Sequence, residues 1–276
     1  MKNYIRLLRP QQWIKNFFVF APLIFSAKFL MANYWLQPIF VFIFFSIASS
    51  TVYIFNDLKD ADRDRLHPTK SKRPIASGLV TKKAAVGLLL IACLIMGIFW
   101  LKMPRIGNVI ILYILINAMY TLSLKKVPVV DIFVIAIGFV LRVYAGAIAV
   151  LVPVSDWMFI TTLSLALYLA SIKRLQELQL HGIEARDVLR NYSVKLVERY
   201  AEMSATAALT FYSMFVITSR PNMAVTIPIV LFGIFRYWYL VDQGKEGESP
   251  TDSLLQDWQL ISAVAIWVIT SIILIA

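Results

Sequence analysis

Four carboxylates occur within nine residues of a chain that is otherwise strongly apolar. The stretch NDLKDADRD, residues 56–64, contains Asp57, Asp60, Asp62 and Asp64. If the stretch is helical, successive residues are about 100° apart, so Asp57, Asp60 and Asp64 share one face and Asp62 points the opposite way. Like charges three and four residues apart repel each other. The stripe therefore predicts a cation between the side chains.

Magnesium is the cation that suits this stripe. Mg²⁺ prefers oxygen ligands and is usually held by one or two carboxylates, water and substrate phosphates. We therefore predict a magnesium site that binds a diphosphate, with the three aspartates of the stripe as catalytic residues. The predicted metal ligands are Asn56, Asp57, Asp60 and Asp64. The alternative is a solvated acidic loop whose charges are balanced by the interleaved basic residues.

A basic run, HPTKSKRPIASG, follows at residues 67–78. Its cations Lys70, Lys72 and Arg73 suit phosphate oxygens that are not already bound to metal. Charged residues at a membrane boundary are more often functional than those of a soluble loop. The run favours the diphosphate interpretation over the solvated loop.

These charged segments must be positioned by membrane-spanning helices. Of the 276 residues, 59% are hydrophobic and 16% are charged, and the mean hydropathy is +0.72, which excludes an ordinary soluble domain. Apolar runs of about 17 to 25 residues are long enough to cross a bilayer. We expect an all-α membrane protein, a single catalytic domain over residues 1–276, with nine transmembrane helices. The expected spans are residues 16–34, 36–55, 84–101, 106–124, 128–152, 155–172, 202–219, 223–241 and 257–275.

The charges are strongly biased to one side of this arrangement. The N-terminus and the even-numbered loops carry 22 of the 27 Lys and Arg residues, which assigns them to the cytoplasm and the C-terminus to the outside of a cell membrane. The same side carries 15 of the 16 acidic residues. We expect a cytoplasmic active-site cavity formed by the loops at 56–83 and 173–201. The single cysteine, Cys93, and only two histidines argue against a disulfide and against a histidine-built metal site.

The aspartate stretch fits the motif NDxxDxxxD, and the chain resembles the UbiA superfamily of intramembrane prenyltransferases. Several stretches are most similar to its branch of polyprenyl-phosphate phosphoribosyltransferases. They are LRPQQWIKNFFVFAPLIF at 8–25, HPTKSKRPIASG, VPVVDIFVIAIGFVLRVYAGA at 127–147 and KRLQEL at 173–178. The resemblance runs from residue 8 to about residue 258. It implies nine helices with active-site loops after spans two and six.

The second loop departs from the superfamily pattern, in which a second aspartate-rich motif follows span six. Residues 173–199 carry scattered acids and six basic residues. Because phosphoribosyl pyrophosphate has a diphosphate on C1 and a phosphate on C5, direct cationic contacts suit its second anion, and Arg binds phosphate well. The candidate substrate contacts here are Lys173, Arg174, Glu177, Arg186, Arg190 and Tyr192. The alternative is ordinary ion pairs of Glu177 with Lys173 and Arg174, worth ~0.3 to 0.5 kcal/mol each.

Three further candidates come from the same resemblance. Tyr120 and Lys125, in YTLSLKK at 120–126, resemble a Tyr and Lys pair that follows span four. The alternative is an aromatic belt residue beside positive-inside lysines. Lys15 belongs to the N-terminal pattern and is either a contact for a lipid phosphate or an interfacial anchor.

Two ionisable residues lie inside the fifth expected span. Asp131 and Arg142 are eleven residues apart, which is three helical turns and one face. Charged residues inside a membrane are usually paired or functional. Either the two pair with each other, or Asp131 completes the cytoplasmic polar site and Arg142 lies deeper.

The resemblance implies transfer of 5-phosphoribose from phosphoribosyl pyrophosphate to a polyprenyl, decaprenyl-like, phosphate, for lipid-linked arabinose donor and cell-envelope glycan synthesis. Magnesium would neutralise the departing pyrophosphate. One alternative is a prenyltransferase that moves an isoprenoid from its diphosphate to an aromatic acceptor, to which the missing second aspartate motif is the main objection. Another is a transporter of an anionic lipid. No nucleic-acid partner is expected, and the oligomeric state is left open.

Overall fold

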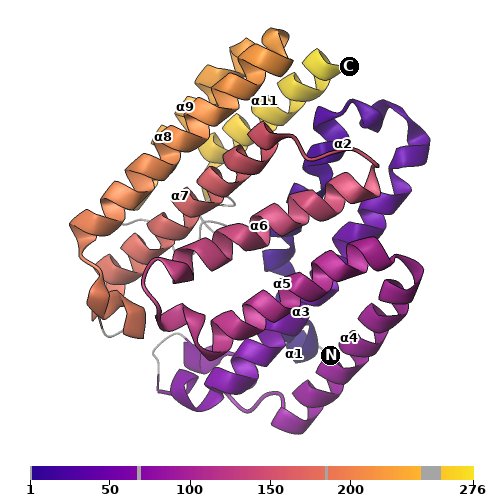
Figure 1. Cartoon of the computed structure of the whole chain (residues 1–276). Helices are drawn as coiled ribbons and strands as arrows, with labels where there is room; N and C mark the ends of the chain where they lie inside the picture. Colours follow the sequence, from indigo (N-terminus) through magenta and orange to yellow (C-terminus); the bar gives the residue numbers. More distant parts are fainter. Residues whose placement is uncertain (1, 67–69, 184–185, 244–255) are drawn as a thin grey trace.

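The computed structural model describes residues 2–66, 70–183, 186–243 and 256–276, and within these ranges the chain forms helices and no strand (Figure 1). The longer helices are α1 (Lys2–Leu8), α2 (Ala21–Phe25), α3 (Leu36–Asp64), α4 (Lys82–Lys102), α5 (Pro104–Leu122), α6 (Val130–Ala149), α7 (Asp156–His181), α8 (Val194–Ser219), α9 (Ile227–Asp242) and α11 (Trp258–Ile275). Short 3₁₀ helices connect them: η1 (Pro10–Phe20), η2 (Lys28–Leu30), η3 (Ala32–Tyr34), η4 (Lys70–Lys72), η5 (Leu124–Lys126), η7 (Asp187–Asn191) and η8 (Pro221–Thr226).

Seven helices of the described residues are long and apolar enough to cross a membrane. The other two expected spans differ from them. Residues 16–34 fall on η1, α2, η2 and η3, so no continuous α-helix covers them. Residues 202–219 lie in α8, whose first turns carry Lys195, Glu198 and Arg199. The all-α membrane fold is confirmed, whereas the described residues do not confirm nine spans.

The backbone conformation shows where the first apolar segment is broken. Pro10 lies before the segment, and at Pro22 the helical path continues from η1 into α2. Within residues 16–34 the breaks lie at Ala27, whose φ is +62°, and at Met31, which is extended. Between α1 and η1 the chain turns at Arg9, whose φ is +51°. These breaks let the N-terminal segment fold back against α3 and α6.

Among the described residues the buried apolar side chains form five clusters, of which two are the largest. One core combines residues of α7, α8, α9 and α11 with Ile132 of α6. The other lies between η1, α3, α4, α5 and α6. Helix α6 contributes to both of these clusters, and at Gly146 it approaches η1 so closely that a Cβ atom there would clash with the carbonyl oxygen of Val19. The segment that carries the N-terminal cations is therefore fixed against the middle of the bundle.

The chain direction brings the charged segments to one end of the bundle. Helices α3, α5 and α7 end there, α4, α6 and α8 begin there, and α1 lies at the same end (Figure 1). The C-terminus lies at the opposite end. The two charged loops and the N-terminal segment can therefore contribute to a single site.

Candidate active site at the charged end of the bundle

The aspartate stripe forms on the last two turns of α3, which runs without interruption from Leu36 to Asp64. The side chain of Asp57 is 1% exposed, that of Asp64 6% and that of Asp60 24%, whereas Asp62 is 75% exposed. Asp62 instead pairs at the surface with Arg65 and Lys82. The predicted helical stripe, with Asp62 facing away from it, is confirmed.

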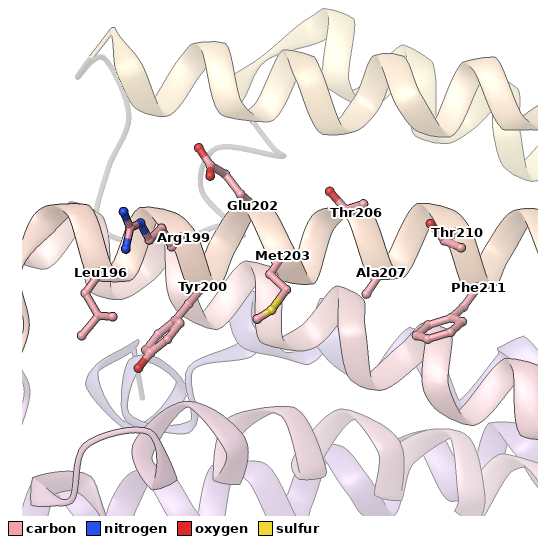
Figure 2. Close-up of a pocket in the computed structure, with 9 residues that line it drawn as sticks. All are labelled: Leu196, Arg199, Tyr200, Glu202, Met203, Thr206, Ala207, Thr210 and Phe211. Carbon is pink, nitrogen blue, oxygen red and sulfur yellow. The ribbon is translucent and has the colours of Figure 1, made fainter.

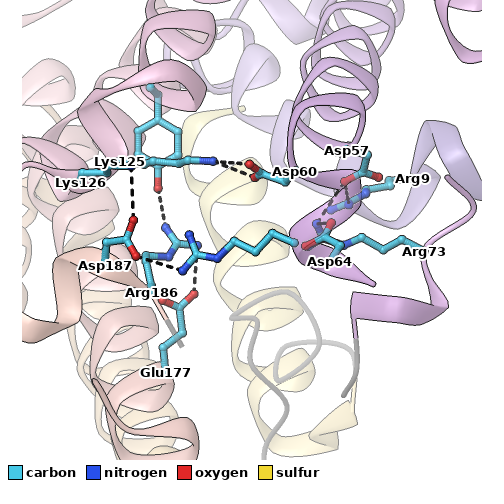
Figure 3. Close-up of polar contacts among 12 residues, drawn as sticks. Arg9, Asp57, Asp60, Asp64, Arg73, Lys125, Lys126, Glu177, Arg186 and Asp187 are labelled. Atoms are coloured by element: carbon cyan, nitrogen blue, oxygen red, sulfur yellow. Dashed lines mark hydrogen bonds and ion pairs between the residues drawn. The ribbon is translucent and has the colours of Figure 1, made fainter. Parts of the chain in front are cut away.

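Cationic side chains from three other segments cover this stripe (Figure 3). Arg9 lies 2.6 Å from Oδ1 of Asp57. Arg73 bridges two carboxylates, at 3.2 Å from Asp57 and 2.6 Å from Asp64. Lys125 of η5 lies 2.7 Å from Asp60. The repulsion expected between the aspartates is thus relieved by the chain's own cations.

The donor set of the stripe also fits a hard divalent cation. Oδ2 of Asp57 is buried and accepts no hydrogen bond from the described residues. The carboxylates of Asp57, Asp60 and Asp64 lie on one helical face of α3 by sequence spacing. In Figure 3 that of Asp60 lies toward Lys125, whereas those of Asp57 and Asp64 lie toward Arg9 and Arg73. Among the described residues no three acidic, His or Cys side chains converge in the way a preformed metal site requires. Binding of a metal ion would therefore involve displacement of the present cationic partners.

The second loop contains a buried charge network. Arg174 is 0% exposed; its Nε lies 3.2 Å from Oδ2 of Asp131, and its Nη1 pairs with Glu177 three residues further along α7. Arg186 extends the network, since it donates to the hydroxyl of Tyr120 at 2.9 Å and lies 3.4 Å from Glu177. Glu177 does pair with Arg174, as the ion-pair alternative required, but the pair is buried rather than at the surface.

Tyr192 ties the second loop to the start of α6. Its hydroxyl donates to Oδ1 of Asp131 at 2.8 Å and accepts from the backbone N–H of Val129 at 2.6 Å. Burial and the neighbouring Asp131 carboxylate raise the pKa of Tyr192, so the hydroxyl keeps its proton and remains a donor. Val129 has φ +69°, a strained backbone for a β-branched residue. The observed contacts of Tyr192 are therefore with the protein.

Arg186 faces the site from the other end of the second loop. Burial lowers the pKa of its guanidinium, but the nearby Tyr120 and Glu177 outweigh burial and raise the pKa overall. The side chain is about one quarter exposed. It is therefore a permanently charged group that is held in place yet still accessible.

The remaining predicted residues are placed as follows. Lys15 donates to Gln12 at 2.6 Å, and its positive charge lies near enough to repel that of the half-buried Lys173. Lys70 of the first loop interacts with Glu177 of the second. The others are the half-buried Asn56 and the exposed Lys72 and Arg190. The structure thus gathers most of the predicted residues, from both loops and the N-terminus, at one end of the bundle.

The sequence interpretation missed several members of this site. Arg9 was not selected, although it lies in the same N-terminal stretch as Lys15. Asp187 of η7 was also missed; it lies 3.0 Å from Arg63 of α3 and 3.5 Å from Lys126 of η5, and so links the two loops. The sequence did contain a signal for Arg9. It is a cation directly before Pro10, and a cation at such a turn can reach the end of a neighbouring span.

Asp131 and Arg142 do not pair with each other. Asp131 belongs to the second-loop network, whereas Arg142 lies deeper and is buried. Arg142 donates to Oδ1 of Asn16 at 2.7 Å, to the Gly138 carbonyl at 2.6 Å and to the Tyr113 hydroxyl at 3.1 Å. It therefore connects η1, α5 and α6 within the bundle, and the second of the two alternatives is the one observed.

A groove along α8 is separate from this site (Figure 2). Of the residues that the structure describes, those lining it all belong to α8: Leu196, Arg199, Tyr200, Glu202, Met203, Thr206, Ala207, Thr210 and Phe211. Most of these side chains are apolar or carry a hydroxyl group, and none was predicted to bind a substrate. The charged end of the bundle therefore remains the candidate site.

Fold and site define a class of protein: a multi-pass helical membrane protein that gathers carboxylates and cations from several helices at one end of its bundle. The chain belongs to the UbiA prenyltransferase family, whose model matches residues 17–272. This agrees with the resemblance that the aspartate motif indicated. The family places the chain among membrane transferases.

Relatives and solved structures cover nearly the whole chain. The decaprenyl-phosphate phosphoribosyltransferase of Mycolicibacterium smegmatis is 32% identical over 97% of this chain and 91% of the relative. The protein of the same name from Mycobacterium tuberculosis is 32% identical, over 96% and 92%. A UbiA homolog from Archaeoglobus fulgidus, solved bound to DMAPP and Mg²⁺, has a TM-score of 0.72 and 19% identity, with 99% of both chains covered. At that identity the structural likeness shows the fold.

Proposed function

We propose that this protein transfers 5-phosphoribose from phosphoribosyl pyrophosphate to a polyprenyl phosphate in a bacterial membrane and releases pyrophosphate. The product would serve the synthesis of a lipid-linked pentose donor for cell-envelope glycans. The relatives named for decaprenyl phosphate support this substrate class, because they match the chain over nearly its full length. The observation that carries the proposal is the presence of two groups of cations at one end of the bundle.

The two cationic groups suit a donor with two separate anionic ends. Arg9 and Arg73 lie at the aspartate stripe, where the pyrophosphate would bind. Arg186 and Lys173 lie at the second loop, where the 5-phosphate would bind. A prenyl diphosphate has only one anionic end and needs only the first group. Arginine favours phosphate because its planar guanidinium can form two parallel hydrogen bonds.

In this proposal an oxygen of the lipid phosphate attacks C1 of the ribose while the bond from C1 to the pyrophosphate oxygen breaks. The bonding electrons leave with pyrophosphate, and positive charge develops on the ribose, as in glycoside cleavage. The cations at the stripe stabilise the charge that grows on the leaving group. A lipid phosphate is already ionised near neutral pH, so no general base has to remove a proton from it.

Magnesium fits the stripe as a cofactor. Asp57, Asp60 and Asp64 would hold it, with Asn56 as an additional oxygen ligand, and the unpartnered Oδ2 of Asp57 is available to a cation. Bound Mg²⁺ would supply Lewis-acid neutralisation of the departing pyrophosphate. The chain's own contribution is to keep these carboxylates on one side of α3 and to keep Asp62 away from them.

Two buried residues, Asp131 of α6 and Arg174 of α7, would position the donor rather than touch it. Asp131 and Arg174 are both inaccessible, and they pair with each other beneath Arg186 and Glu177. A buried pair of this kind fixes the end of α7 relative to α6. We therefore assign them a supporting role, with Tyr192 as the link between them and the loop.

The acceptor and the membrane orientation complete the proposal. The lipid chain stays in the bilayer while its phosphate reaches the charged end of the bundle, where Lys15 is a candidate contact. This end would face the cytoplasm, together with the N-terminus, and the C-terminus would lie outside. The broken N-terminal segment and α8 would supply the remaining two of nine membrane crossings.

The competing function is prenyl transfer to an aromatic acceptor, which the name of the family favours. One assay separates the two functions. The purified protein is incubated with Mg²⁺, labelled phosphoribosyl pyrophosphate and a polyprenyl phosphate, and in parallel with a prenyl diphosphate and 4-hydroxybenzoate. The proposal predicts labelled phosphoribosyl lipid and pyrophosphate in the first reaction only. Consumption of prenyl diphosphate, or turnover of neither donor, would contradict it.

A further inference from the structure

Arg9 occupies an unusual place at the aspartate stripe. It lies outside α3, between α1 and η1. Its backbone has φ +51°, a conformation that residues other than glycine rarely adopt. Its guanidinium lies 2.6 Å from Oδ1 of Asp57 and 4.9 Å from the centre of the Tyr53 ring. The N-terminal segment thus delivers a cation to the first aspartate of the motif from 48 residues away.

The two carboxylate oxygens of Asp57 differ in their contacts: one has two cationic partners and the other has none among the described residues. Arg9 and Arg73 both approach Oδ1, while Oδ2 is buried without a partner among the described residues. A divalent cation on this carboxylate would bring a further positive charge close to both guanidinium groups. At least one of the two guanidinium groups must then move, because positive charges that share one carboxylate repel each other strongly in a partly buried site.

Of the two arginines, Arg9 is the one free to leave. Arg73 would remain tied to Asp64, at 2.6 Å, after contact with Asp57 is lost. For Arg9, Asp57 is the sole carboxylate partner within the described part of the chain. Its side chain is one quarter exposed, so it can turn toward a ligand without unfolding of the helix.

We propose that Arg9 is an exchangeable ligand of the diphosphate site: it neutralises Asp57 when no metal is bound and moves to the pyrophosphate group when the metal-loaded donor arrives. The inference rests on the proposed function for the identity of the donor. Its core concerns any pyrophosphate group that binds beside Asp57. The exchange keeps the charge of the site nearly balanced in both states.

The exchange predicts opposite effects of one substitution. In Arg9→Gln the competitor for Asp57 is removed, so the affinity for a divalent cation in the absence of phosphate should rise, by about 3-fold to 10-fold for a partly exposed ion pair. The affinity for pyrophosphate in the presence of Mg²⁺ should fall by about 10-fold or more, because a charge-assisted contact is lost. A residue that only supports the structure would weaken both.

The test measures the two affinities separately on the full chain in detergent. Mn²⁺ binding is followed by electron paramagnetic resonance without phosphate, and pyrophosphate binding is followed by calorimetry in saturating Mg²⁺. Lys82→Gln is the matched control, since Lys82 pairs only with the outward-facing Asp62, at 3.4 Å, within the described residues. Neither affinity should change in the control.

Weaker Mn²⁺ binding in Arg9→Gln, or unchanged pyrophosphate affinity, would overturn the proposal. Should Arg9→Gln fold poorly, Arg9→Lys provides the same test, since it keeps the charge but loses the planar fork; it should retain Mn²⁺ affinity near that of the unmodified protein and lose part of the pyrophosphate affinity. Because pyrophosphate replaces the sugar donor, the result does not depend on which donor the enzyme consumes. A failure of the proposed function would appear instead in the donor assay.

Discussion

The acidic residues at the end of α3 differ in their surroundings although they lie within eight positions of one another. Asp57 and Asp64 are nearly inaccessible and share Arg73, while Asp62 is exposed at the surface. Helical geometry alone separates them, since a shift of two residues turns a side chain by about 200°. The same residue type therefore serves the site at three positions and the surface at one.

Asp57→Asn should reduce turnover by at least about 100-fold, because it removes a carboxylate that would hold the magnesium ion opposite the leaving group. Asp62→Asn should change turnover by less than about 2-fold, because surface ion pairs contribute little. Both variants should unfold near the temperature of the unmodified protein, since the cations around Asp57 are partly exposed and can be hydrated. Steady-state rates and thermal unfolding in detergent provide the measurement. Equal losses of turnover in the two variants would contradict the stripe.

Tyr192→Phe tests whether the second loop depends on one hydroxyl group. The substitution leaves Oδ1 of Asp131 without its donor and the Val129 N–H without its acceptor, at a cost of about 1 to 3 kcal/mol in the free energy of unfolding. Tyr144→Phe, at a half-exposed position of α6, is the control and should be neutral. Denaturation of both variants under the same conditions measures the difference. If Tyr192→Phe were as stable as the control, the link between the second loop and α6 would be unimportant.

Local periodicity made the stripe predictable, and distance along the chain made its partners unpredictable. The positions of Asp57, Asp60 and Asp64 on one face follow from helical geometry over eight residues. The contact of Arg9 with Asp57 depends on how a broken N-terminal segment folds back, which no local pattern contains. Arg174 illustrates the same limit: its residue type favoured phosphate binding, but its burial beside Asp131 is a tertiary property.

At the scale of elements, the close approach of η1 and α6 holds the N-terminal cations in place. Gly146→Ala should destabilise the protein by about 1 to 3 kcal/mol, because the new Cβ would require η1 to move away from α6. Gly233→Ala, in α9, is the control; no atom of the described residues lies within 4 Å of its added Cβ, and the change should be neutral or stabilising by up to about 1 kcal/mol. Thermal unfolding of the two variants distinguishes the outcomes, and equal midpoints would contradict the tight contact.

Helix α11 is fixed at its start by a charged cap. Asp257 accepts from the backbone N–H of Leu260 at 2.8 Å, and Arg236 of α9 donates to both of its oxygens, at 3.1 and 2.7 Å. The hydrogen bond with Arg236 is the main reason that the pKa of Asp257 is lowered. Because the pKa is lower in the folded state, the stabilisation is complete above the unfolded pKa of about 4 and is lost as the pH falls through the folded value.

Asp257→Asn should therefore lower stability by about 1 to 2 kcal/mol at pH 7, since the cap oxygen remains but the charge is lost. The difference from the unmodified protein should shrink as the pH is lowered from 5 toward 3. Unfolding midpoints across this range measure the effect. A difference that stays constant with pH would show that the charge of Asp257 does not stabilise the contact between α9 and α11.

The elements themselves were largely predictable because long apolar runs fix helices in a membrane. Seven expected spans correspond to helices that meet the length and hydropathy required. The first segment is not one continuous helix, because hydropathy does not register the backbone breaks at Ala27 and Met31. The seventh falls on α8, a longer helix whose polar first turns lie at the charged end.

At the scale of the whole molecule, the fold solves a problem of access. A lipid phosphate and a sugar donor differ in solubility, and they can meet where a bundle embedded in the bilayer ends in a charged surface. The connections α3 to α4, α5 to α6 and α7 to α8 all lie at that end, so residues far apart in the sequence meet there. The strong charge bias of the loops predicted this gathering, although it did not predict the individual contacts.

The central claim is that the aspartate stripe and the second loop together bind a donor with two anionic ends. The most direct measurement is an experimental structure of the full chain with Mg²⁺ and phosphoribosyl pyrophosphate. We expect the pyrophosphate group beside Asp57, Asp60 and Asp64, and the 5-phosphate beside Arg186 and Lys173. A donor bound away from the stripe, or bound there with its 5-phosphate far from the second loop, would contradict the account.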